Sequence, residues 1–241
     1  MKQLARWLYG AYAWLLFVLV MLSFGALIVL LQRPAQARPL ARCTARTLFF
    51  LAGIRVSAHG MGRLPDGPHI LLVNHTSFLD AIVLTALLPA RPGYAFTTRQ
   101  QFRSQIVLWP LLRALGTIVF KPTVPLHSSP NLGLMAAALR RGGNIVVFPE
   151  GGFVPGAGLQ PFHSGAFVVA EMERLPVVVA GLRGARKALR PGTWMPRRNP
   201  IRLEIGMVIS PEAFSGRSPL QLAEIAHAAM EELTGEKPAL A

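Results

Sequence analysis

Acidic residues and cysteine are scarce in this 241-residue sequence. It has 11 aspartates and glutamates against 25 lysines and arginines, and its one cysteine is Cys43. A single cysteine excludes a disulfide framework and any metal site built from several thiolates. The formal net charge of +14 points instead to a polyanionic partner, either nucleic acid or anionic lipid.

The distribution of charge favours lipid over nucleic acid. Residues 1–65 contain no acid, and basic residues flank or follow an apolar run, residues 7–31, that carries no charge. The run exceeds the roughly 20 residues that an α-helix needs to cross a hydrocarbon core. No zinc knuckle, RNP-type aromatic strand or helix-turn-helix pattern supports nucleic-acid binding. We therefore expect membrane lipids as partners, and no nucleic acid.

The apolar run has two interpretations. Aromatic residues gather at its start, where amphipathic rings suit the membrane interface, and this favours a retained anchor. A cleaved signal peptide has a shorter apolar core and a small-residue cleavage site, which Ala35 and Ala37 imitate only weakly. The length of the run favours the anchor.

A basic segment follows the apolar run. Arg38, Arg42 and Arg46 recur at four-residue spacing, so on a helix they form one stripe suited to anionic headgroups. The alternative is an ordinary amphipathic helix that docks on the rest of the protein. We expect residues 1–52 to form the membrane anchor and this helix, and residues 53–241 to form the remaining domain.

Short apolar runs alternate with helix-like segments after the anchor. Strands are expected at residues 54–58, 69–73, 93–97, 117–120, 144–148, 177–182 and 201–205, and helices at 78–88, 101–115, 131–140 and 219–233. This alternation is typical of an α/β domain with a mostly parallel central sheet flanked by helices.

Only two acids, Asp80 and Glu150, occur between Gly67 and Ala170, and each follows an apolar strand-like run. Reactive groups of open α/β sheets gather beyond the carboxyl ends of strands. His75 also lies at such an end, five residues before Asp80. The three side chains therefore predict an active site.

A histidine and an aspartate on either side of a strand-to-helix turn can form a general base. Imidazole accepts protons near neutral pH, and a carboxylate on its second nitrogen fixes the tautomer and stabilises the cation. Ser77 and Asp80 also resemble a helix capping box, in which Asp80 only satisfies an end amide. Capping leaves His75 unexplained, so catalysis is the favoured interpretation.

Several reaction classes lack their motifs in this sequence. There is no G-x-S-x-G elbow, so a membrane-tethered hydrolase with a serine nucleophile is disfavoured. There is no H-E-x-x-H pattern or paired-carboxylate cluster, so we expect no metal. A glycine-rich phosphate-binding loop is also absent from the sequence. A base without an enzyme nucleophile indicates direct attack by a hydroxyl group of the substrate.

The segment around His75 resembles a known family. Its residues N-H-T-S-F-L-D, 74–80, are similar to the N-H-x-x-x-x-D motif of the glycerolipid acyltransferases, the group of 1-acyl-sn-glycerol-3-phosphate acyltransferase. Further blocks agree in order and spacing: G-M-G-R-L-P at 60–65, F-P-E-G at 148–151, F-H-S-G-A-F at 162–167 with histidine in place of lysine, and L-P-V-V-V-A-G-L-R-G at 175–184. The resemblance covers roughly residues 56–209.

The resemblance implies a mechanism that agrees with the residue-level interpretation. His75, oriented by Asp80, would deprotonate an acceptor hydroxyl, which attacks the thioester of acyl-CoA or acyl-carrier protein. Glu150 would bind or position the acceptor, with Gly151 and Gly152 allowing close approach of the backbone. No cofactor is expected beyond the acyl donor. The reaction would yield phosphatidic acid on the cytoplasmic face of the inner membrane.

Two departures from the family pattern concern the acceptor. Lys121 stands near the position of an arginine that binds phosphate in the family, and Phe153 replaces the third residue of a Gly-Thr-Arg continuation. Lysine is a point charge without the bidentate fork of arginine. The expected phosphate ligands are Lys121 and Arg183, with Arg99 and Arg186 as further candidates. Another lysophospholipid or lyso-ornithine lipid is an alternative acceptor, and a non-catalytic membrane-surface lipid-binding protein is the alternative of another class.

Overall fold

The computed structural model describes residues 2–121, 129–152, 156 and 158–239. The strands are β1 (Val56–His59), β2 (Ile70–Val73), β3 (Tyr94–Arg99), β4 (Ile118–Phe120), β5 (Asn144–Val147), β6 (Val177–Arg183) and β7 (Ile201–Ile209). The α-helices are α1 (Lys2–Val20), α2 (Ala26–Leu31), α3 (Pro34–Leu51), α4 (Asp80–Leu87), α5 (Leu108–Ala114), α6 (Ser129–Arg140), α7 (Gly165–Glu173), α8 (Ala185–Ala188) and α9 (Pro219–Thr234). A π-helical segment, η1 (Met21–Gly25), joins α1 to α2, and short 3-10 helices lie at η2 (Met61–Arg63), η3 (Gln100–Ser104) and η4 (Pro211–Phe214).

The described strands form one sheet in the order β1-β7-β6-β2-β5-β3-β4. Pairing is parallel throughout except between β6 and β7. The carboxyl ends of β2, β5 and β3 therefore lie along the same edge of the sheet, as the predicted active site requires. The predicted α/β fold with a mostly parallel sheet is confirmed.

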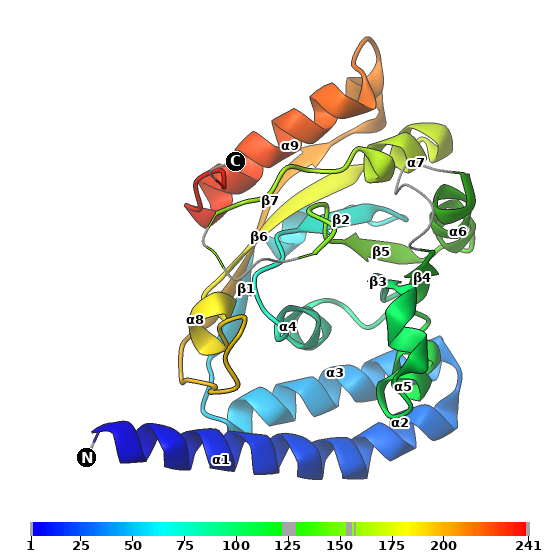
Figure 1. The fold of residues 1–241 in the computed structure, drawn as a ribbon. Coiled ribbons are helices and arrows are strands. Elements are labelled where there is room, and N and C mark those ends of the chain that lie inside the picture. Colours follow the sequence, from blue (N-terminus) through cyan, green and yellow to red (C-terminus); the bar gives the residue numbers. More distant parts are fainter. Residues whose placement is uncertain (1, 122–128, 153–155, 157, 240–241) are drawn as a thin grey trace.

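Helices cover both faces of the sheet, as Figure 1 shows, with α6, α7 and α9 on one side and α4 and α3 on the other. The central strand β2 is wholly buried, and its side chains alternate between two apolar clusters: Ile70 and Leu72 in one, Leu71 and Val73 in the other. Double coverage explains why central strands read as continuous apolar runs in the sequence.

The N-terminal helices form a hairpin outside α4. The apolar helix continues through η1 to Leu31, Gln32 adopts a left-handed conformation, and α3 returns alongside with Pro34 at its first position. The hydroxyls of Tyr9 and Tyr12 donate to the carbonyls of Ala52 and Leu51, at 2.9 Å each. These bonds tie the start of α1 to the end of α3. Among the described helices, residues 3–31 are long and apolar enough to cross a membrane, and most of their surface is exposed.

The single helix expected at residues 101–115 is wrong, because the structure breaks it into η3 and α5. Pro110 gives the physical reason. A proline ring clashes with the carbonyl four residues earlier in a helix and has no N–H to donate, so proline is best tolerated in the first helical turn. The helix therefore begins at Leu108, and Ile106 and Val107 before it are each 89% exposed.

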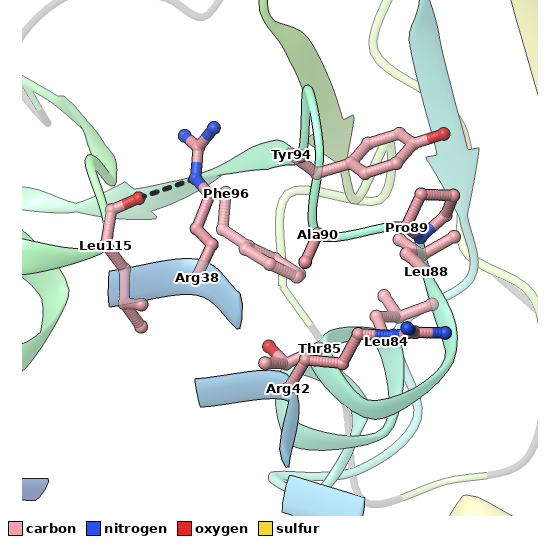
Figure 2. Close-up of a pocket in the computed structure, with 11 residues that line it drawn as sticks. Arg38, Arg42, Leu84, Thr85, Leu88, Pro89, Ala90, Tyr94, Phe96 and Leu115 are labelled. Carbon is pink, nitrogen blue, oxygen red and sulfur yellow. Dashed lines mark hydrogen bonds between the residues drawn. The ribbon is translucent and has the colours of Figure 1, made fainter. Parts of the chain in front are cut away.

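The three arginines of α3 do not share one environment. Arg38 and Arg42 line a pocket between α3 and the connection from α4 to β3, shown in Figure 2. The Arg38 guanidinium donates to the carbonyls of Leu115 and Pro92, both at 3.2 Å. Arg46 is exposed. The predicted basic stripe is thus divided, and the pocket lies at the edge of the sheet opposite the carboxyl ends of the strands.

Candidate active site

The catalytic turn, residues 74–79, follows directly from β2 and is fixed by a side chain that continues the sheet. The Asn74 amide donates to the carbonyl of Leu182 at 3.0 Å and accepts from the Leu182 N–H at 2.6 Å. Asn74 thereby pairs with β6 through its side chain, and its backbone turns away from the sheet. No sequence pattern near Asn74 indicates this role, since the partner lies 108 residues away along the chain.

His75 and Asp80 meet as predicted. The Nδ1 atom of His75 lies 2.8 Å from Oδ2 of Asp80, whose side chain is fully buried, while 20% of the His75 side chain is exposed. The same Oδ2 accepts from the backbone N–H groups of Thr76 at 2.6 Å and Ser77 at 2.9 Å. An oxygen with two amide donors is an acceptor, so His75 must donate through Nδ1–H. In this tautomer Nε2 carries the lone pair that can take a proton.

The contacts of Asp80 agree with both the catalytic and the capping interpretation. Its carboxylate meets the Ser77 amide, as in the second half of a capping box, but the Ser77 hydroxyl accepts from Leu79 and donates to the carbonyl of Leu189. One buried carboxylate oxygen therefore orders the turn and orients the imidazole. The ring is also stacked on Phe148, with centroids 4.1 Å apart and planes inclined by 19°.

Glu150 lies at the end of β5 and holds the main chain of the turn. Its Oε1 accepts from the backbone N–H of His75 at 2.7 Å, and its Oε2 accepts from the N–H of Gln160 at 3.0 Å. Burial raises the pKa of Glu150 above its ordinary value, and the two hydrogen bonds offset part of that shift. Both carboxylate oxygens thus contact protein backbone. In the structure Glu150 thus supports the main chain of His75, and its role in binding the acceptor stays a prediction.

A C-terminal segment fixes the other end of the Glu150 loop. Leu159 donates to the carbonyl of Lys237 at 2.9 Å and accepts from the N–H of Ala239 at 3.0 Å. Arg186 donates to the carbonyl of Gly156 and pairs with Glu236 at 3.2 Å. Gln160, which bonds Glu150, directly follows the residue held in this way. The chain far from the motif therefore contributes to the order of the catalytic turn.

The two glycines after Glu150 lie between cationic and aromatic side chains. Gly151 has φ of +72°, and a Cβ there would lie 3.0 Å from the His163 ring. A Cβ on Gly152 would lie 2.9 Å from the Arg99 guanidinium, which donates to the carbonyl of Gly151 at 2.6 Å. The positive φ and the His163 ring favour glycine at position 151, whereas a Cβ at position 152 would displace the flexible end of the Arg99 side chain.

The predicted phosphate ligands divide into two groups. Arg99 and Lys121 lie at the ends of the neighbouring strands β3 and β4, where Arg99 pairs in register with Phe120. Lys121 is exposed, and its backbone is held by the side chain of Asn131. Arg183 donates instead to the carbonyls of Leu233 and Glu232 at the end of α9. Of these cations, Arg99 is bonded directly to the Glu150–Gly152 segment.

No cluster of three histidine, cysteine or acidic side chains suited to a metal ion occurs in the described part of the chain. The arrangement brings together a histidine, an orienting carboxylate, a supporting glutamate and a nearby arginine. Such a site can remove a proton from a hydroxyl group beside a cationic anchor for an anion.

Comparison with known proteins agrees with this chemistry. The profile of a family described as Acyltransferase matches residues 55–182. A 1-acyl-sn-glycerol-3-phosphate acyltransferase of Pseudomonas aeruginosa is 24% identical over 192 residues, or 77% of this chain and 71% of that protein. A chloroplastic 1-acyl-sn-glycerol-3-phosphate acyltransferase of Brassica napus is 28% identical over 142 residues, or 58% of this chain but only 40% of its own length. This chain thus matches less than half of that plant relative.

The fold also has a close counterpart among solved structures. The crystal structure of the 1-acyl-sn-glycerophosphate (LPA) acyltransferase PlsC from Thermotoga maritima superposes with a TM-score of 0.77 at 20% identity, covering 97% of this chain and 98% of the other. At that identity the likeness concerns the fold. Together with the family profile, it confirms the resemblance drawn from the sequence blocks.

Proposed function

This chain belongs to the acyltransferase family, and on that basis we propose that it moves a fatty acyl group from acyl-CoA or acyl-carrier protein to the free hydroxyl of 1-acyl-sn-glycerol-3-phosphate, giving phosphatidic acid. The observation that carries the proposal is the 2.8 Å contact between His75 and the buried Asp80 at the carboxyl edge of the sheet. The relatives named above supply the choice of acceptor.

The proposed mechanism uses His75 as the base. The acceptor oxygen attacks the carbonyl carbon of the thioester while its proton passes to Nε2 of His75, and Asp80 stabilises the resulting imidazolium through Nδ1–H. Backbone N–H groups of the turns stabilise the oxyanion of the tetrahedral intermediate. Collapse of the intermediate forms the new ester and expels the thiolate, which takes the proton from His75 and leaves as a thiol. No covalent acyl-enzyme is needed.

The acceptor phosphate is best placed near Arg99 and Lys121. Arg99 is tied to Gly151 and so lies beside the segment that supports His75. Its fork can bind phosphate in bidentate fashion, and Lys121 adds a point charge from the next strand. An acceptor without a phosphomonoester, such as another lysophospholipid or lyso-ornithine lipid, is the second candidate, since Gly152 and Phe153 stand where the family pattern continues to an arginine.

Lipid substrates agree with attachment to the membrane through α1, η1 and α2. The exposed apolar surface of these helices supports insertion, and the greater number of basic residues after the run supports a catalytic domain on the cytoplasmic face of the inner membrane. Acyl thioesters are made on that side.

The deciding experiment incubates the full chain in vesicles with labelled acyl-CoA or acyl-carrier protein and a panel of acceptors. The panel contains lysophosphatidate, lysophosphatidylcholine and lyso-ornithine lipid, with His75→Ala as the catalytic control. We expect transfer to lysophosphatidate that the His75→Ala protein lacks. Transfer only to an acceptor without a phosphomonoester would select the second candidate, and transfer to none of them would contradict the proposal.

A further inference from the structure

The loop between α8 and β7, residues 189–200, reaches from the catalytic turn to the N-terminal helix, and Figure 1 shows it descending toward α1. At its start, the carbonyl of Leu189 accepts from the Ser77 hydroxyl at 2.8 Å. At its middle, the carbonyl of Trp194 accepts from the indole N–H of Trp14 at 2.7 Å. The loop therefore connects the helix that is proposed to bind the membrane with the turn that carries His75.

Further contacts seat the loop on α1. The Trp14 and Trp194 rings have centroids 5.8 Å apart, and the sulfur of Met195 packs against Gly10, where a Cβ would leave it no room. The Arg198 guanidinium lies 4.9 Å above the ring of Tyr9. These contacts hold the loop beside the exposed apolar surface of the helix.

The tip of the loop is itself apolar and exposed. Trp194 is 73% exposed although it is the largest side chain of the loop. Its ring is stacked with that of Phe78, which is 56% exposed, with centroids 6.3 Å apart and planes inclined by 9°. Phe78 is three residues from His75. A continuous aromatic surface thus runs from α1 across Trp194 to the edge of the catalytic turn.

The charged side chains of the loop and of the sequence on either side of it have one sign. Lys187, Arg190, Arg197 and Arg198 are exposed, and residues 174–203 contain no acid. Exposed tryptophan surrounded by lysine and arginine suits the interfacial zone of an anionic bilayer, where indole rings concentrate and each basic residue near the surface adds attraction.

We propose that residues 189–200 are a second membrane-binding element, in which Trp194 and Phe78 enter the interfacial zone of the bilayer next to the active site. The inference rests on the proposed function, because the acceptor is then a lipid of that bilayer. Insertion here brings the headgroup region close to His75, so a lipid acceptor reaches the base without leaving the membrane surface. The partner is the lipid surface; a protein partner at this patch is the alternative that the experiment tests.

The first test measures the depth of Trp194 in vesicles of phosphatidylethanolamine and phosphatidylglycerol that contain brominated acyl chains. The full chain and its Trp194→Phe variant are compared, so that the difference in fluorescence reports position 194. We expect the Trp194 signal to be quenched by bromines near the headgroups more than by those near the chain ends. A signal unaffected by brominated lipid would place the loop in water or against a protein, and would overturn the inference.

The second test separates lipid access from folding and chemistry. Apparent KM is measured for a long-chain acceptor in vesicles and for a short-chain acceptor dissolved as monomers. Trp194→Ala should raise the first KM about tenfold more than the second, a factor equivalent to ~1.4 kcal/mol, and Trp194→Phe should recover much of the difference. Trp109→Phe, which replaces a tryptophan of α5, is the matched control and should leave the ratio unchanged.

The outcomes distinguish the two proposals. Equal effects of Trp194→Ala on both acceptors would reduce the loop to a structural role and overturn the inference. If the wild-type chain transferred acyl groups to no acceptor, the proposed function would fail, while the quenching experiment would still decide whether Trp194 lies in the membrane.

Discussion

Replacing Asp80 by asparagine tests the catalytic pair with the least change of shape. Oδ2 of Asp80 accepts from His75, Thr76 and Ser77, and the side chain is fully buried. An asparagine oxygen in the same place keeps all three donors but carries no charge. Hydrogen bonds to a charged group contribute about 1.5–3 kcal/mol and neutral ones about 0.5–1.5 kcal/mol, so each of these contacts is weakened rather than lost.

The second oxygen of Asp80 adds a further cost. Oδ1 is buried and has no hydrogen-bond partner among the described residues, so an amide NH₂ in its place would be an unpaired buried donor. Such a group costs about 1–3 kcal/mol. We therefore expect Asp80→Asn to lower the free energy of unfolding by a few kcal/mol and to leave the protein folded, measured by urea titration.

The effect on catalysis should exceed the effect on folding. Without the carboxylate, the imidazolium that forms during proton transfer loses its neighbouring charge. We expect kcat to fall by ~10²–10⁴, the range for a positioned general base. The exposed Asp66 provides a matched aspartate-to-asparagine control, which should behave like wild type.

The assay compares single and double variants in vesicles with labelled acyl-CoA. Residues that act as one unit show strongly non-additive losses, so His75→Ala combined with Asp80→Asn should lose little more than His75→Ala alone. A kcat for Asp80→Asn within about threefold of wild type would refute the reasoning, because base positioning contributes far more than that. Asp80 would then be a structural cap only.

Three further predictions follow from the site and the N-terminal hairpin. Because burial raises the pKa of Glu150, its contribution to stability is greatest at low pH and is lost as pH rises through the raised pKa. Glu150→Gln should therefore flatten this part of the curve of unfolding free energy against pH, which urea titrations at several pH values would measure. Parallel curves for the wild type and the variant would contradict the raised pKa. Arg99→Met should weaken lysophosphatidate binding by ~1.5–3 kcal/mol, seen mainly in KM for the acceptor, and Lys121→Met is measured beside it. Unchanged kinetics of both variants would show that Arg99 and Lys121 do not bind the acceptor phosphate. Deleting residues 1–32 should release much of the protein from membranes, and high salt should release more of the deletion variant because ionic contacts are screened. Vesicle flotation would measure both effects. A mature chain that begins near Arg38 would instead establish a signal peptide.

Much of the candidate site could be predicted because its signals are local. The apolar runs before His75 and Glu150 are strands buried on both faces, and parallel pairing brings their carboxyl ends together. His75 and Asp80 lie within one turn of each other, so sequence spacing alone is enough to suggest their contact. The alternation of strands and helices likewise predicts the α/β fold.

The rest depends on contacts between distant segments. Nothing near Asn74 indicates that its amide pairs with Leu182, and nothing near Glu150 indicates that its carboxylate holds the backbone of His75. β7 runs antiparallel to β6, and this direction depends on the path of the chain through the loop of residues 189–200. The break before Leu108 is different, because Pro110 is a local signal that disfavours one continuous helix over residues 101–115.

The pairing of Leu159 with Lys237 and Ala239 has a consequence for the order of events during protein synthesis. The motif residues and the loop after Glu150 leave the ribosome well before residues 237–239 exist. The N-terminal helices, made first, can meet the bilayer while the support for His75 is still incomplete. On the proposed function, we therefore expect a nascent chain to reach the membrane before it can transfer acyl groups.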